Sequence, residues 1–155
     1  MTPLEEIQTY LPHRPPMLLL EEVVAVTEQD AHCRVRVSPA GVLAPFLDAK
    51  GALPSWYGLE LIAQTVGVWS GWGRCRRDEN GAELGMILGA RDLSCTEDRF
   101  APGSLLDIHV DLIMQDGRFA GFEGRILCGE KRIVSGRVTT FQPQGDELAG
   151  LFTRE

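Results

Sequence analysis

Alternation of apolar and polar residues is the most regular pattern in this chain. From Ala31 to Val37 every second residue is apolar, and the residues between are His or Arg. A period of two is typical of strands that bury one face. We therefore expect everything after Leu84 to be strand, with tight turns at Asp116-Gly117 and Gly129-Glu130. The clearest strand segments in the chain are Leu18–Val26, Ala31–Val37, Leu106–Met114, Arg118–Cys128 and Arg132–Phe141.

A helical period replaces this alternation between about Ser55 and Arg77. The apolar residues that recur at helical spacing are Leu59, Ile62, Ala63, Val66 and Trp69, and the segment would be about 34 Å long. Each of its four glycines costs about 1 kcal/mol relative to alanine. Gly67-x-x-x-Gly71 therefore indicates either close packing against another backbone or a break in the helix near Gly71.

A short helix is also expected at the start of the chain. Thr2-Pro3-Leu4-Glu5 has the form of a capping box with proline at the first helical position, and the helix should end near Tyr10, before Pro12. The expected fold class is α+β: a long central helix wrapped by a curved antiparallel sheet of about six strands. We expect one domain over residues 1–155, with an ordered core from about 3 to 142.

Composition narrows the classes of function. The 155 residues are 44% hydrophobic and 24% charged, with a formal charge of −7, which argues against binding to a phosphate backbone. Four scattered cysteines without a CxxC pair indicate reduced thiols rather than disulfides or a zinc site. Without a visible secretory signal or an apolar span free of polar residues, we expect a cytoplasmic protein.

Glu60 is the most unusual carboxylate, because it lies within the apolar helix. Burial there would raise its pKa and suit it to acid or base work, whereas a position in the first helical turns would leave it solvated near the helix dipole. Gln64, one turn later, would share its face. His32 and His109 fall on polar strand faces and are expected to be solvated.

Two further residues could act as a base. His13 lies in Leu11-Pro12-His13-Arg14-Pro15-Pro16, where prolines fix the backbone, so it could serve a site or lock the turn. Asp48 lies in the loop before the helix, where aspartate is usually a turn former.

The two ends of the helix carry other candidates. Ser55 could cap the helix, and its N–H could hold a developing oxyanion. Trp56 could line a substrate tunnel or belong to the core. The arginines at the opposite end complement the helix dipole and could also dock an acidic carrier protein: Arg74, Arg76 and Arg77.

Three segments resemble the hotdog-fold 3-hydroxyacyl-(acyl-carrier-protein) dehydratases, in particular the divergent branch associated with aryl polyenes. Leu11–Val24 resembles their N-terminal motif, Leu59–Gln64 the start of their central helix, and Arg99–Leu106 a later strand with its Pro-Gly turn. The segments come in the family's order over about residues 7–140. The resemblance implies a hotdog fold and a dimer, either of one chain or with another hotdog dehydratase.

The resemblance also implies roles for individual residues. The family's helix glutamate, which handles the departing hydroxyl, corresponds to Glu60. Its backbone N–H that polarises the thioester carbonyl corresponds to Ser55. The family's catalytic histidine lies in a Gly-His-Phe-Pro stretch fourteen residues before the glutamate, but counting back from Glu60 reaches Phe46, and Pro45–Pro54 contains no histidine.

The predicted function is therefore elimination of water from a 3-hydroxyacyl thioester on acyl carrier protein or coenzyme A. Glu60 would be the acid/base residue, His13 or Asp48 the base, and Gln64 and Trp56 substrate contacts. The alternatives are a non-catalytic thioester-binding or heterodimer subunit and a hotdog thioesterase. No metal or redox cofactor is expected, because the elimination needs only acid/base groups and an oxyanion site.

Overall fold

The computed structural model describes residues 4–76 and 86–141, with only the backbone described for residues 4–6 and 86–88. Its elements in chain order are α1 (Leu4–Tyr10), β1 (Glu22–Val26), β2 (Asp30–Arg36), η1 (Ala44–Phe46), β3 (Leu53–Pro54), η2 (Ser55–Tyr57), α2 (Gly58–Arg76), β4 (Met86–Cys95), β5 (Arg99–Phe100), β6 (Leu105–Asp116), β7 (Phe119–Cys128) and β8 (Lys131–Phe141).

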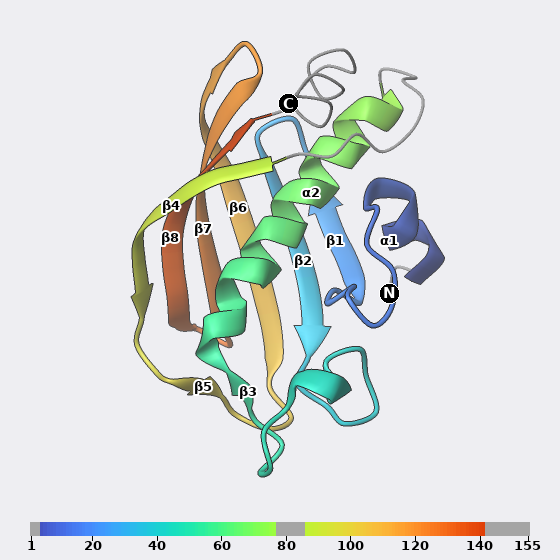
Figure 1. The fold of residues 1–155 in the computed structure, drawn as a ribbon, viewed down its shortest axis with the longest axis vertical. Coiled ribbons are helices and arrows are strands. Elements are labelled where there is room, and N and C mark those ends of the chain that lie inside the picture. Colours follow the sequence, from blue (N-terminus) through green and yellow to red (C-terminus); the bar gives the residue numbers. More distant parts are fainter. Residues whose placement is uncertain (1–3, 77–85, 142–155) are drawn as a thin grey trace, which may run out of the picture.

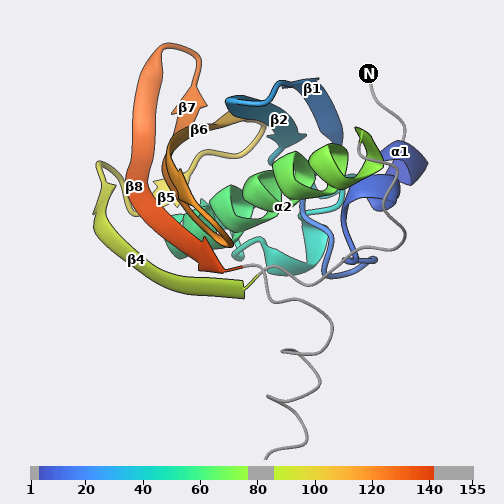
Figure 2. The same ribbon diagram turned by 90° about the horizontal axis from the view of Figure 1, so that it is seen from above.

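One curved antiparallel sheet surrounds the long helix. In the described part of the chain its six strands follow the order β1-β2-β6-β7-β8-β4, and β3 pairs separately with β5. Figure 1 shows α2 lying across the concave face, and Figure 2 shows β8 and β4 curling around one side of it. The predicted α+β hotdog architecture is confirmed.

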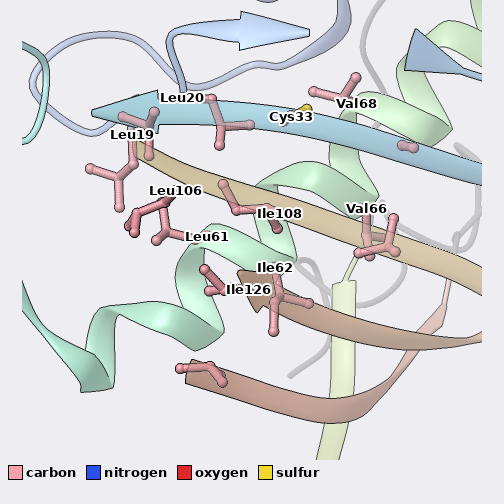
Figure 3. Packing of buried hydrophobic residues seen from close by; sticks show 14 of the residues in the cluster. Leu19, Leu20, Cys33, Leu61, Ile62, Val66, Val68, Leu106, Ile108 and Ile126 are labelled. Atoms are coloured by element: carbon pink, nitrogen blue, oxygen red, sulfur yellow. The ribbon is translucent and has the colours of Figure 1, made fainter. Parts of the chain in front are cut away.

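The core lies between α2 and the central strands (Figure 3). Leu61 and Ile62 of the helix are fully buried with Ile108 of β6 and Ile126 of β7. Gly124 of β7 lets the helix approach the sheet, because an added Cβ would lie 2.6 Å from a methyl group of Ile62. The alternation along the strands therefore directs apolar side chains onto the helix.

The glycines of α2 allow it to pack closely against the N-terminal segment. A Cβ on Gly71 would lie 2.0 Å from the carbonyl oxygen of Tyr10, and a Cβ on Gly67 would lie 2.5 Å from Leu11 Cδ2. The helix continues through Gly71 to Arg76, so the predicted close approach to another backbone is confirmed and the break is not found. That backbone belongs to the same chain.

One predicted strand begins later than expected. Leu18–Leu20 is buried but lies outside β1, which starts at Glu22. The N–H of Leu19 donates to the side chain of Gln64 instead of to a neighbouring strand. The turns at Gly117 and Gly129 are confirmed, with φ of +60° and +63°.

Several expectations concern residues outside the described ranges. These are the Thr2-Pro3 start of the capping box, Arg77, and the segment from 142 onward. Within the ranges that are described, no helix is long and apolar enough to cross a membrane.

Candidate functional site

Gln64 links the first turns of α2 to the N-terminal segment through a hydrogen-bonded clamp that consists of Gln64, Glu60, Met17 and Leu19. Its amide nitrogen donates to Met17 O (2.8 Å) and to Glu60 Oε1 (2.9 Å), and its amide oxygen accepts from Leu19 N–H (2.9 Å). The side chain is 1% exposed. The Gln64 amide is buried and hydrogen-bonded within the chain, and its predicted contact with substrate stays a prediction. Gln64 holds the Glu60 carboxylate and the preceding segment in place.

Glu60 and His13 meet at the edge of this clamp. His13 Nε2 lies 3.7 Å from Glu60 Oε1, and the two side chains are 34% and 45% exposed. Glu60 therefore does not have the fully buried environment that the apolar helix suggested. It lies at the surface of the helix's first turn, where the helix dipole favours a negative charge and a substrate could reach it.

The proline-rich segment explains how residues distant in sequence form this pair. The Arg14 guanidinium donates to the carbonyl oxygens of Leu11 and His13, both at 2.8 Å. These bonds fix the backbone on either side of Pro12. His13 is the candidate base that the fold brings to Glu60.

Asp48 forms a turn, which is one of the two roles that the sequence left open for it. Its Oδ1 accepts hydrogen bonds from the backbone N–H groups of Lys50 (2.9 Å) and Ala52 (3.0 Å), and Arg99 lies 3.7 Å from Oδ2. The Ala52 hydrogen bond is the largest effect that lowers the pKa of Asp48. A lowered pKa makes a carboxylate a weaker base, so the structure favours Glu60 and His13 over Asp48.

The backbone N–H of Ser55 is already in use. It donates to Asp98 O at 3.0 Å, where the chain before α2 runs beside the chain before β5, and the Ser55 side chain is buried. An oxyanion could bind this N–H only by displacing Asp98. The Ser55 N–H therefore has a structural partner in the chain, and its predicted oxyanion role stays a prediction.

Trp56, in contrast, is the most exposed of the large apolar side chains described. It is 73% exposed, and its ring centroid lies 6.1 Å from that of Tyr57. It precedes Glu60 by one helical turn. It therefore belongs to the accessible surface near Glu60 rather than to the core, and its contact with substrate stays a prediction.

The arginines predicted to dock a carrier protein differ in accessibility. Arg74 is 5% exposed and donates to Ser70 Oγ, so it cannot serve as a docking surface. Arg76 is exposed, stacks over Trp72 and pairs with Glu28 at 3.0 Å. Arg77 lies outside the described residues. At 1.5 Å per residue, Arg74 is about 21 Å along the helix from Glu60.

A second titratable cluster, which was not predicted from the sequence, lies on strands β2 and β6. His32 and His109 lie opposite each other on β2 and β6, and their rings stack with centroids 4.0 Å apart. His32 Nε2 lies 2.7 Å from Asp107 Oδ1, to which Arg34 Nε also donates. The expectation of two solvated histidines is corrected. Only knowledge of the strand register could have placed the two rings together.

We predict a pH effect from His109. Burial, with added repulsion from His32 and Arg125, lowers the pKa of His109 below its ordinary value. As pH falls through about 6.5, the unfolded chain binds this proton before the folded chain does, so the folded state loses stability. Urea unfolding at about pH 7.5 and about pH 5.5 should show a smaller loss for His109→Gln than for wild type. Equal losses in both proteins would contradict this assignment.

A second prediction concerns Gln64. Gln64→Leu keeps the approximate volume but leaves the buried Leu19 N–H without its acceptor, which should cost about 2 kcal/mol of unfolding free energy. Chemical denaturation measures this loss. Gln115→Leu, at an exposed position on β6, is the matched control and should be close to neutral. A loss at Gln64 no larger than that at Gln115 would show that the clamp does not stabilise the fold.

Comparisons with known proteins agree with the fold. The family described as ApeP-like, ApeP dehydratase, matches residues 5–153. A 3-hydroxyacyl-[acyl-carrier-protein] dehydratase, FabZ, from Streptococcus pyogenes serotype M49 (strain NZ131) is 30% identical over 143 residues, covering 90% of this chain and 96% of that protein.

Solved structures give the same result. A chain in the dehydratase heterocomplex ApeI:P from Xenorhabdus doucetiae is 47% identical with a TM-score of 0.89, covering 96% of this chain and 97% of that one. A hypothetical thioesterase with coenzyme A from Streptococcus pneumoniae TIGR4 is 14% identical with a TM-score of 0.60, covering 79% and 84%, and shares only the fold. The resemblance found in the sequence is therefore confirmed, and the chain belongs to the ApeP-like dehydratase family.

Proposed function

We propose that this chain acts in the dehydration of 3-hydroxyacyl thioesters carried by acyl carrier protein, as one subunit of a complex with a second hotdog protein. The observation that carries the proposal is the Glu60 carboxylate, which is accessible on the first turn of a buried helix and held by Gln64. The related FabZ is a dehydratase of this substrate class, and the related ApeI:P assembly is a heterocomplex.

Elimination of water requires two proton transfers. A base removes a proton from C2, next to the thioester carbonyl, and an acid protonates the hydroxyl on C3 so that it leaves as water while the C2–C3 double bond forms. In this proposal Glu60 protonates the hydroxyl, because its side chain is 45% exposed and so open to a bound molecule. The base is either His13 or a group of the second subunit.

A second candidate function is a non-catalytic subunit that binds the thioester or supports its partner. Two observations favour it. Asp48 is engaged in a turn, and the Ser55 N–H that would polarise the carbonyl donates to Asp98. In that case the complete set of catalytic groups would lie in the second subunit, and this chain would shape the assembly.

The proposed setting is the cytoplasm, in a pathway of fatty-acid or polyketide type. Coenzyme A thioesters are the alternative substrates, and a homodimer is the alternative assembly. The chemistry proposed for Glu60 is general acid/base catalysis and draws on no metal or redox cofactor.

The test is mass spectrometry of crotonyl and 3-hydroxybutyryl thioesters, on acyl carrier protein and on coenzyme A. The chain is assayed alone and as a tagged protein purified from its native host together with any bound subunit. Gain or loss of one water by either preparation supports a dehydratase, and activity only in the second supports the heteromeric form. No turnover by either preparation would reject the catalytic proposal and favour the binding subunit. Release of free thiol would instead indicate a thioesterase.

A further inference from the structure

The two nitrogens of the His13 ring have different surroundings. Nε2 faces the Glu60 carboxylate, 3.7 Å from Oε1. Nδ1 is buried and has no hydrogen-bond partner among residues 4–76 and 86–141. The charged groups near the ring are Glu60 on α2 and Arg14 in its own segment, and the Arg14 guanidinium donates to backbone carbonyls. The ring therefore has an acceptor on one edge only.

This asymmetry favours one tautomer of the neutral ring. A neutral imidazole carries one N–H donor and one lone-pair acceptor. With the proton on Nε2, the donor faces a carboxylate oxygen and only a lone pair is left buried. With the proton on Nδ1, a buried N–H has no acceptor and a lone pair faces the carboxylate, so both edges are mismatched.

Gln64 and His13 both direct a nitrogen toward the same oxygen of Glu60. Gln64 Nε2 donates to Oε1 at 2.9 Å, and His13 Nε2 approaches that same atom. No residue in the described ranges donates to Oε2. Oε2 is thus the oxygen left to act on a substrate. A second hydrogen bond to Oε1 would require the 3.7 Å separation to shorten by about 0.5 Å or more.

We infer that His13 is a positioning residue for Glu60: a neutral ring that donates its Nε2–H to Oε1, rather than the base that removes the C2 proton. This inference rests on the proposed function of Glu60 as the acid/base residue. It also implies that the C2 proton is taken by a group other than His13. With His13 holding Oε1, the second oxygen of Glu60 keeps a fixed direction toward the substrate.

The first test measures the tautomer directly and needs no activity. Long-range ¹H–¹⁵N NMR spectra of the full chain near neutral pH identify which ring nitrogen carries the proton, and the His13 signals are those absent in His13→Gln. We expect the Nε2–H tautomer, with signals that shift in Glu60→Gln. A ring protonated on Nδ1, or on both nitrogens, would overturn the inference even if the enzyme proves active.

The second test uses the geometry of amide replacements. Glutamine places its N–H₂ near the position of histidine Nε2, whereas asparagine places it near Nδ1. We expect His13→Gln to keep kcat within about threefold of wild type, and His13→Asn and His13→Ala to lose about tenfold or more in kcat with little change in KM. Thermal unfolding of each variant separates a loss of fold from a loss of positioning.

These tests distinguish failure of the inference about His13 from failure of the proposed dehydratase function. If His13→Gln loses as much kcat as His13→Ala while both fold normally, His13 is the base and the inference is wrong. If the wild-type complex shows no turnover, the dehydratase proposal fails. The tautomer and its response to Glu60→Gln then decide on their own whether His13 donates to Glu60.

Discussion

Gly71→Ala is expected to lower the free energy of unfolding by about 3 kcal/mol or more, which corresponds to a fall in Tm of roughly 6–12 °C for a chain of this size. The added methyl group would lie 2.0 Å from the carbonyl oxygen of Tyr10 and 2.7 Å from its carbonyl carbon and Cα. These are backbone atoms, so no rotation of a side chain relieves the contact. The helix and the N-terminal segment would have to separate.

The sign of this effect makes it diagnostic. Glycine to alanine within an unobstructed helix normally stabilises a protein by about 1 kcal/mol, so a large loss can come only from the tertiary contact. Gly67→Ala should cost less than Gly71→Ala, because the atom it meets is the flexible end of Leu11. Thermal and urea unfolding of the variants measure both effects.

Gly89→Ala is the matched control. Gly89 lies on β4 at an exposed position, and an added Cβ there has no atom within 4 Å. We expect a change in unfolding free energy within about 0.5 kcal/mol. If Gly71→Ala proved as mild as Gly89→Ala, the close contact between α1 and α2 would not exist in solution.

Local patterns in the sequence were sufficient to predict the architecture. Alternation over Ala31–Val37 placed Cys33 and Val35 in the core, and the glycines of the long helix indicated that another backbone approaches closely. The sequence could not identify that backbone as Tyr10. A small-residue face fits a partner subunit as well as it fits a segment of the same chain, and only the path of the fold decides.

In the candidate site, too, some contacts could be predicted from the sequence and others could not. The spacing of Glu60 and Gln64 by four residues predicted their contact, because such residues share a helix face. The approach of His13 could not be predicted, since it depends on how Gln64 binds the backbone of Met17 and Leu19 across a long separation in sequence. The stacked His32 and His109 rings were not expected either, because their contact depends on the register of β2 against β6.

Position in the helix also did not predict the surroundings of two charged and polar groups. Arg74 ends a helix, where cations are usually exposed, yet it is buried and bonded to Ser70. The N–H of Ser55 lies where an unpaired helix donor is expected, yet the chain around Asp98 supplies an acceptor. Both differences arise from contacts between distant segments, which residue type and spacing do not encode.

Glu60→Gln is expected to lower the rate of dehydration by about a hundredfold or more, the usual contribution of a positioned general acid or base. The substitution removes the ionisable carboxyl group but keeps the size of the side chain. The amide oxygen of the new glutamine can still accept from Gln64. The fold should therefore be retained. Turnover of 3-hydroxybutyryl and crotonyl thioesters by mass spectrometry, with unfolding curves measured in parallel, checks both expectations.

Glu123→Gln is the matched control for Glu60→Gln. It makes the same chemical change at an exposed position on β7, next to the buried Phe122 and Gly124, so its side chain points to the outer face of the sheet, away from α2. We expect wild-type turnover from this variant. If Glu60→Gln were as active as Glu123→Gln, Glu60 would not be the acid/base residue. An active wild-type complex would then take its catalytic carboxylate from the second subunit, and this chain would serve that subunit by binding rather than by chemistry.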